Sequence, residues 1–296
     1  MKHLHKILFF FFLSLSVYAQ DLKDLTNYSS GSVQEVLENF SQLENYYSVH
    51  HDRRKLFVKI YSHITYGIED MISSRQVIHG AWLEDLIIGF SDEYRKAVWA
   101  YESNQMNQVP LAWRYDFDQS RAAQIGRATQ LLLSLNSHIL FDLPLTISKN
   151  MNSSIGLNKY KEDYFKLNQM FKNLIPQLFA ILYREENFKN TWNNHPAELL
   201  KKEIVGQLVV QMRKAAWKRS LFLADIRDAK MRNSYIKQIE IQTVQLSKLV
   251  VSLDPFLSTI PGQIVPEHLR ENTLKTLKSI YLILDPHASL HNLVKF

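Results

Sequence analysis

Histidine and aspartate occur one helical turn apart in an apolar segment near the middle of the chain, Asn136-Ser137-His138-Ile139-Leu140-Phe141-Asp142-Leu143-Pro144. Side chains at positions i and i+4 project from the same face of a helix. An imidazole and a carboxylate in this arrangement can hold a metal ion or act as an acid–base pair. His138 and Asp142 are therefore the candidate catalytic residues.

The same pair falls in phase with the apolar stripe of its predicted helix. Counting by three and four from Ala128 passes two leucines and then reaches His138 and Asp142. Both side chains should point toward the core, where an unpaired carboxylate costs several kcal/mol. Three interpretations remain open: an ion pair with an arginine or with His138, a metal or acid–base site, and an exposed pair beyond the end of a short helix.

Asp163 is a further carboxylate at the head of an apolar stripe, which consists of Leu167, Met170, Leu174 and Leu178. It either caps the first turn of its own helix or supplies a third ligand beside His138 and Asp142. In the second interpretation, these three residues would bind a divalent metal such as zinc.

Arg213 and Trp217 lie one turn apart in another largely apolar helix, within the segment QMRKAAWKRS. A buried arginine is the expected counter-charge for an aspartate, with the indole covering its aliphatic stem. This pairing competes with the metal hypothesis, because Arg213 would already neutralise Asp142. Asp92, at the border of the buried face of its own helix, offers another carboxylate.

Helices must position these residues, and apolar residues recur at helical spacing through most of the chain. No strand-like alternation extends beyond a few residues. Ser32 followed by Glu35 predicts a capping box at the start of the first helix. A longer helix is expected over about residues 118–147, with Pro144 kinking or ending it. The sequence predicts one all-α domain, residues 32–296, with about seven or eight helices.

Composition excludes several classes of protein. The chain has 296 residues, of which 46% are hydrophobic and 22% charged, so it can bury a large core. Glycine and proline contribute only 8 residues each, which argues against a β-sandwich, a P-loop and a dinucleotide-binding fold. The absence of cysteine excludes disulfides, thiol catalysis and iron–sulfur clusters.

The N-terminal segment MKHLHKILFFFFLSLSVYAQ has the pattern of a secretory signal peptide, residues 1–19. Two lysines precede a short apolar run, and Ala19 ends a small-residue cleavage pattern. Residues 20–31 read as a flexible leader. Processing would lower the formal net charge from +6 to +4, so we expect no nucleic-acid partner. The most hydrophobic later window, residues 131–147, is interrupted by Asn136, His138 and Asp142, so we expect no stable membrane insertion of the mature chain. The expected location is periplasmic or extracellular, with the oligomeric state unknown.

Several separated segments resemble a bacterial family of unknown function, domain-of-unknown-function family 5995, whose signature is an Asn-Ala-His-Ile-x-x-Asp-Leu box. Here the box spans residues 136–143, with serine in the place of alanine. The other matching residues are Trp82 with Phe90 and Tyr94, Pro110 with Trp113 and Phe117, Asp163 with Phe165 and Asn168, and Arg213 with Trp217. The resemblance covers about residues 55–225. It implies an all-helical domain in which these polar residues cluster, without an established activity.

A weaker resemblance is to zinc-dependent phospholipases C and related nucleases, which are exported helical enzymes with histidine and aspartate at the same spacing. Those enzymes carry further histidines, one of them shortly after a proline downstream of the aspartate. Residues 145–148, which follow Pro144, contain no histidine. This departure argues against a trinuclear zinc site.

Two functions of different classes fit these residues. The first is an exported, non-enzymatic helical protein, in which the polar cluster is a packing network or binds a small ligand. The second is an exported metal-dependent hydrolase acting on a phosphate or ester bond, with His138 and Asp142 as ligands or acid–base pair. Access separates them, because a reaction centre must open to a pocket. The candidate binding residues are Asn136, Asp163, Asn168, Arg213, Trp217 and Asp92.

Overall fold

The computed structural model describes residues 21–27, 29–149, 154–185, 195–259 and 263–285. The longer helices are α2 (Val33–Val49), α3 (Lys55–Ser73), α4 (Gly80–Glu102), α5 (Leu111–Ala122), α6 (Arg127–Ser137), α9 (Lys161–Glu185), α10 (Pro196–Asp225), α11 (Ala229–Ser252) and α13 (Glu267–Leu284). The short elements are η1 (Asp24–Thr26), η2 (His138–Asp142), α7 (Leu143–Lys149), α8 (Ser154–Asn158) and α12 (Asp254–Leu257). The all-α prediction is confirmed, since these residues contain no strand.

The prediction of seven or eight helices is wrong, because breaks divide segments that the apolar periodicity joins. The helix expected over residues 118–147 is interrupted near its start, where α5 ends at Ala122 and α6 begins at Arg127. Ala123 has a left-handed backbone, with φ at 52°, and an α-helix cannot continue through that conformation. The short elements η1, α8 and α12 add further helices, and a turn with π-helical hydrogen bonding separates α6 from α7.

The N-terminal part of the described chain is packed against the helices. Ser32 Oγ accepts the amide of Glu35 at 3.2 Å, which confirms the predicted cap of α2, while the Glu35 carboxylate accepts the amide of Gly31 at 2.7 Å. The segment expected as a flexible leader includes η1, in which Leu25 and Thr26 are buried. The side chain of Arg95, from α4, donates a hydrogen bond to the carbonyl of Thr26. The predicted signal peptide lies outside the described residues.

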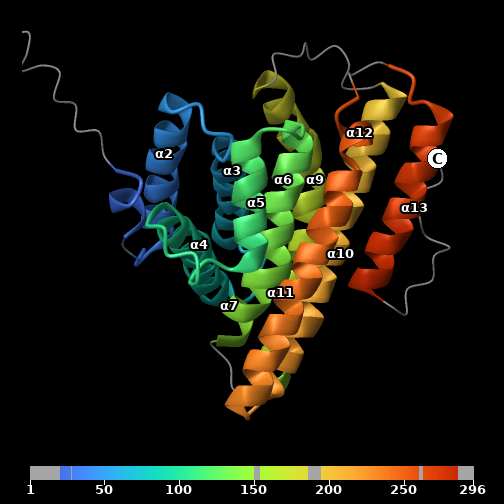
Figure 1. The fold of residues 1–296 in the computed structure, drawn as a ribbon. Coiled ribbons are helices and arrows are strands. Elements are labelled where there is room, and N and C mark those ends of the chain that lie inside the picture. Colours follow the sequence, from blue (N-terminus) through green and yellow to red (C-terminus); the bar gives the residue numbers. More distant parts are fainter. Residues whose placement is uncertain (1–20, 28, 150–153, 186–194, 260–262, 286–296) are drawn as a thin grey trace, which may run out of the picture.

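A continuous helical segment, α6, η2 and α7, runs through the interior of the fold. It contacts α3, α4, α5, α10 and α11. Figure 1 shows α2 and α4 on one side of the molecule, α10, α11 and α13 on the other, and α6 between them. One main hydrophobic core joins residues from nearly all of the helices, as expected for a single domain.

This central segment, residues 127–149, is also long and apolar enough to cross a membrane, with a mean hydropathy of 1.3 in its most apolar window. However, 94% of that window is buried inside the fold. Its apolar side chains therefore pack against the other helices as a core helix does.

Candidate functional site

The His138–Asp142 pair occupies a widened helical turn in the central segment. In η2 the amide of Leu143 donates to the carbonyl of His138, five residues earlier, as in a π-helix. Pro144 follows at once and has no N–H to donate, so the carbonyl of Leu140 lacks its helical partner. The Arg219 guanidinium, from α10, donates to that carbonyl at 2.8 Å. The widened turn is thus held by a side chain from a neighbouring helix.

His138 and Asp142 are buried and in contact, as their phase with the apolar stripe predicts. His138 Nδ1 and Asp142 Oδ2 share a hydrogen bond of 2.8 Å, and their side chains are 2% and 1% exposed. Trp113 Nε1, from α5, donates to the same carboxylate oxygen at 2.7 Å. The partner of the pair is therefore the indole of Trp113. Trp113 carried part of the family resemblance but was not among the candidate site residues.

Aromatic rings enclose the imidazole of His138. The ring of Phe90 is stacked on it, with 3.4 Å between ring centroids. Phe57, Tyr61 and Trp113 surround it at centroid distances of 5.4, 5.3 and 5.8 Å. His138 Nε2 is buried without a hydrogen-bond partner among the described residues. The imidazole therefore lies in an apolar, closed environment.

Burial acts on the two partners in opposite directions. It lowers the pKa of His138 well below its usual value, because the apolar surroundings disfavour the imidazolium. Burial also raises the pKa of Asp142 well above its usual value, and the negative charge of Glu93 adds to this, although the Trp113 hydrogen bond opposes it. Both shifts favour the uncharged forms, so the pair is a hydrogen-bonded pair and not an ion pair.

Asp163 does not join this pair. It lies in the first turn of α9, but its carboxylate accepts the amides of Ile78 and His79 at 2.9 and 2.7 Å and the His79 ring at 2.8 Å. Asp163 thus caps the N-terminus of α4, not that of its own helix. Burial alone would raise the pKa of Asp163, but these hydrogen bonds outweigh it and the pKa is lowered.

Arg213 is not the counter-charge of Asp142, so that prediction is wrong. Its Nε donates to Asn168 Oδ1 at 2.8 Å and its Nη2 to the carbonyl of Tyr164 at 2.9 Å, both on α9. Trp217, one turn further along α10, packs against Tyr164 with the two rings tilted and 4.8 Å between ring centroids. The indole N–H of Trp217 is buried without a partner among the described residues. Asn168, Arg213 and Trp217 thus form a second polar group between α9 and α10.

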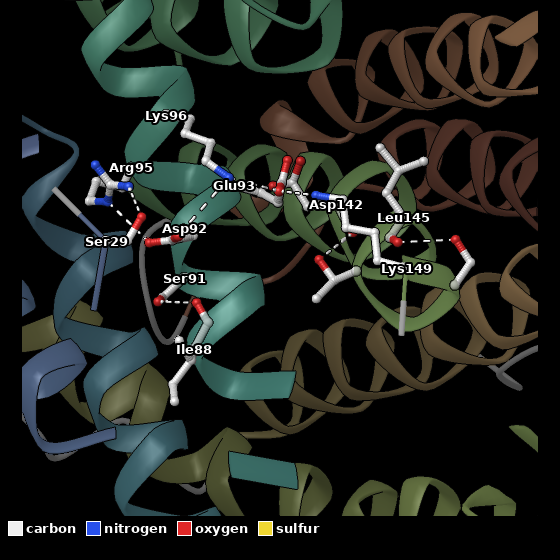
Figure 2. Close-up of polar contacts among 12 residues, drawn as sticks. Ser29, Ile88, Ser91, Asp92, Glu93, Arg95, Lys96, Asp142, Leu145 and Lys149 are labelled. Carbon is white, nitrogen blue, oxygen red and sulfur yellow. Dashed lines mark hydrogen bonds and ion pairs between the residues drawn. The ribbon is translucent and has the colours of Figure 1, made fainter. Parts of the chain in front are cut away.

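The two remaining candidate residues have other partners. Asn136, in α6, donates to the carbonyl of Thr243 at 3.0 Å and to Ser247 Oγ at 2.8 Å, and so ties α6 to α11. Asp92 accepts from Arg95 Nε at 3.2 Å on the outer side of α4. Figure 2 shows Asp92 beside Arg95, while the neighbouring Glu93 faces lysines, Lys96 on α4 and Lys149 on α7. Neither Asn136 nor Asp92 joins the His138–Asp142 pair.

A third buried acid was missed in the sequence. Asp116 in α5 is 1% exposed and accepts hydrogen bonds from Gln130 Nε2 at 2.5 Å and Ser134 Oγ at 2.8 Å. Burial raises its pKa to about 7, against those two hydrogen bonds. Asp116 lies three residues after Trp113, so both side chains lie on the same face of α5. This spacing is the sequence signal that could have identified Asp116.

The residues do not assemble a metal centre. Within the described part of the chain, no group of three histidines, aspartates or glutamates is placed to hold a metal ion. Of the expected ligand set, only His138 and Asp142 are together, and Asp163 is engaged with the start of α4. The imidazole of His138 is enclosed by aromatic rings, which are not ligands for zinc.

The fold and this site define an all-helical single-domain protein with a buried His–Asp–Trp network in its central helical segment. The chain belongs to the family of unknown function DUF5995, whose profile matches residues 33–253. Neither the curated proteins nor the solved structures contain a match to the chain.

Proposed function

We propose that this protein is an exported, non-catalytic binding protein, and that its His138–Asp142 pair is a packing network. The closure of the pair is the observation that carries this proposal. The two side chains are 2% and 1% exposed, and the indole of Trp113 and the ring of Phe90 cover them. A reaction centre must reach its substrate, whereas a packing network is best kept dry.

The position of the pair also supports a structural role. Asp142 connects the central segment to α5 through Trp113, and the imidazole of His138 contacts rings from α3 and α4. Arg219 adds α10 through the carbonyl of Leu140. One widened turn therefore fixes the positions of four neighbouring helices. A hydrolytic role finds no comparable support, because the candidate ligands are not brought together.

Substitutions of Asp142 test the packing role. Asp142→Asn retains an oxygen for the Trp113 N–H, and the imidazole can donate to that oxygen after a change of tautomer. Asp142→Leu leaves both groups buried without a partner, which costs about 3 kcal/mol of unfolding free energy. In urea denaturation, we expect this large loss of unfolding free energy for Asp142→Leu and a loss below about 1.5 kcal/mol for Asp142→Asn. Asp92→Leu changes a partly exposed aspartate and is the matched control, and its unfolding free energy should fall by about 1 kcal/mol or less.

The wild-type protein and a His138→Ala variant test the alternative of a resident metal. A chelator should leave the melting temperature of the wild-type protein unchanged if the pair is a packing network. If the chelator lowers the melting temperature of the wild-type protein but not that of the His138→Ala variant, His138 is a metal ligand and the proposal is overturned. Elemental analysis of the purified protein provides an independent readout.

A further inference from the structure

A cleft of about 330 Å³ lies between the N-terminal segment and α4. Its lining residues come from the chain around η1 and from the second half of α4, and they are Thr26, Asn27, Ser29, Arg95, Lys96 and Trp99. Two apolar cavities in the core offer only about 20 and 40 Å³, which is room for a few water-sized groups. The cleft has room for roughly twenty such groups, and its volume lies in the range of sites that hold small organic molecules.

Arg95 holds the two sides of the cleft together. Its guanidinium is buried and donates from Nη1 to the carbonyl of Thr26 and from Nη2 to Ser29 Oγ, the latter at 3.2 Å. Figure 2 shows Arg95 of α4 beside Ser29 of the N-terminal segment. These two hydrogen bonds fix the segment against α4, so the cleft is already formed before a ligand arrives.

The polar groups of the cleft can both donate and accept hydrogen bonds. Ser29 Oγ accepts from Arg95, so the hydroxyl can donate its own hydrogen to a ligand oxygen. The exposed amide of Asn27 supplies both donors and an acceptor. The Lys96 side chain is 55% exposed, and its ammonium adds further donors. Such a mixed set suits the hydroxyl groups of a ligand, because each hydroxyl donates and accepts at the same oxygen.

The cations in the cleft wall already have carboxylate partners. Arg95 Nε donates to Asp92 Oδ1 at 3.2 Å. Lys96 Nζ lies 3.4 Å from Glu93 Oε1 and 4.0 Å from Asp92 Oδ2. Glu93 also contacts Lys149 of α7, which does not line the cleft. An anionic ligand would have to compete with these carboxylates, so the charges favour a neutral ligand.

Trp99 adds an aromatic surface to this polar cleft. The residue is partly buried and lines the cleft one turn beyond Arg95 on α4. An aromatic ring packs well against a flat apolar surface. A pyranose sugar whose hydroxyls are equatorial has such a surface on each face of its ring, because only C–H bonds project there, and its hydroxyls form a polar rim. The cleft therefore combines a surface for the ring with groups for the rim.

We propose that this cleft binds a neutral pyranose sugar of the β-glucoside type, with its ring against Trp99 and its hydroxyls hydrogen-bonded to Asn27, Ser29 and Lys96. This inference specifies the ligand of the proposed binding protein and so rests on that function. A hexose has about twelve non-hydrogen atoms, fewer than the roughly twenty water-sized groups for which the cleft has room.

Three probes test the proposal on the purified mature protein: methyl β-D-glucopyranoside, methyl β-D-glucuronide and glycerol. We expect the glucoside to bind with a Kd on the order of 1 mM in an NMR titration, with saturation transfer from the protein to its ring C–H hydrogens. Glycerol has hydroxyls but no ring and should bind about tenfold more weakly or less, and the glucuronide adds a negative charge and should also bind more weakly.

Each of three results would overturn the proposal. The first is the absence of saturable binding of the glucoside. The second is equal or tighter binding of the glucuronide, which would show that the cleft takes an anion. The third is equal binding of glycerol, which would show that the ring of the sugar contributes nothing.

Substitutions of Trp99 locate the bound sugar. Trp99→Leu removes the aromatic surface and should weaken glucoside binding about tenfold or more, while Trp99→Phe should restore most of it. Tyr66→Leu is the control, because Tyr66 of α3 is an exposed aromatic residue that does not line the cleft. It should bind the glucoside as the wild-type protein does. Unchanged affinity in Trp99→Leu would place the sugar elsewhere and overturn the proposal.

A surface substitution keeps the test decisive if Trp99→Leu does not fold. Asn27→Ala changes an exposed residue and should weaken glucoside binding about threefold or more. Gln34→Ala removes an exposed amide of α2 that does not line the cleft and should leave the affinity unchanged. Equal affinity in these two variants would contradict the assigned position of the sugar.

Failure of the sugar site is distinguishable from failure of the proposed function. None of the cleft residues belongs to the His138–Asp142 pair or to its hydrogen-bond partner Trp113. An absent glucoside response would overturn the sugar site and leave the packing role of the pair intact. A chelator-sensitive melting temperature with retained glucoside binding would overturn the packing role alone.

Discussion

Buried aspartates in this protein are compensated by hydrogen bonds and not by a direct arginine partner. Asp142 accepts from Trp113, and Asp116 accepts from an amide and a hydroxyl. Burial dominates at both sites, and their pKa values are raised. Asp163 differs, since two backbone amides and an imidazole outweigh its burial and lower its pKa. Among these three aspartates, the pKa is thus raised where only side chains donate to the carboxyl group and lowered where backbone amides donate to it.

The raised pKa of Asp116 makes a measurable contribution to the pH dependence of stability. Its pKa is about 7 in the folded protein and 3.8 in the reference state, so the folded state holds the proton more tightly. The stabilisation is therefore complete below about pH 4 and is lost as the pH rises to about 7, up to about 4 kcal/mol in all. Asp116→Asn removes this contribution, and asparagine still fits because Ser134 Oγ can accept from its amide.

Urea denaturation at several pH values compares this variant with the wild-type protein. The unfolding free energy of the wild-type protein should fall relative to that of Asp116→Asn between about pH 4 and pH 7 and stay parallel above it. Asp85→Asn changes an exposed aspartate of α4 and should keep the wild-type slope. Parallel curves for Asp116→Asn across the whole range would show that Asp116 is ionised in the folded state.

Part of this residue-level chemistry could be predicted from the sequence. The helical phase of His138 and Asp142 with the core stripe predicted their burial and contact, because that relation is local. The partner of Asp142 could not be chosen in the same way. An arginine was one of the partners left open, but the structure has Trp113, and which donor meets a buried acid depends on how distant helices pack.

At the scale of helices, carboxylates distant in sequence cap several N-termini. Asp163 accepts the amides before α4, Glu240 accepts the amide of Leu111 at the start of α5, and Asp254 accepts the amide of Gly126 before α6. Each cap supplies a negative charge and an acceptor where the helix has unpaired N–H groups. The caps therefore connect helices to one another as well as terminating them.

These long-range caps explain which helix starts the sequence could reveal. The start of α2 was predicted because Ser32 and Glu35 are neighbours of the amides that they bind. The start of α6 was missed, because Gly126 has no capping side chain and its acceptor is 128 residues away. Glycine is favoured there by close approach, since a Cβ atom at Gly126 would lie 2.1 Å from Ser258 Oγ and would displace that hydroxyl.

Asp254 gives the sharpest test of a distant cap. Its Oδ1 accepts from the Gly126 amide at 2.8 Å and from the hydroxyls of Thr129 and Ser258 at 2.6 and 2.9 Å. Asp254→Ala removes all three interactions and should cost about 1–2 kcal/mol. Hydrogen exchange should show faster exchange in the first turn of α6, while α2 remains protected. Ser32→Ala provides the local-cap control, with the increase confined to the start of α2.

At the scale of the whole molecule, the central segment explains how an unusually apolar helix fits this fold. Composition alone makes residues 127–149 resemble a membrane span, and only the surrounding helices identify them as a core helix. The all-α class was predictable because apolar spacing is local. The packing of α3, α10 and α11 around this segment was not, because long-range contacts leave no periodic signal in the sequence.

The predicted N-terminal boundary of the mature chain can be compared with the packing of the residues that follow it. Cleavage after Ala19 would remove the apolar run and leave Gln20 at the N-terminus, with Leu22 and Leu25 still in the chain. Both leucines are buried, so cleavage further downstream would remove core residues. The burial of these leucines therefore sets a downstream limit for the predicted cleavage.

Intact-mass measurement of the exported protein tests this boundary. We expect the mass of a chain that begins at Gln20. Ala19→Arg should accumulate as the unprocessed precursor, because a large charged side chain does not fit the small-residue position of the cleavage site. Gln20→Arg, one position later, should still be processed and serves as the control. A mature mass that includes residues 7–17 would show that the apolar run is an anchor, and a start beyond Leu25 would contradict the packed role of η1.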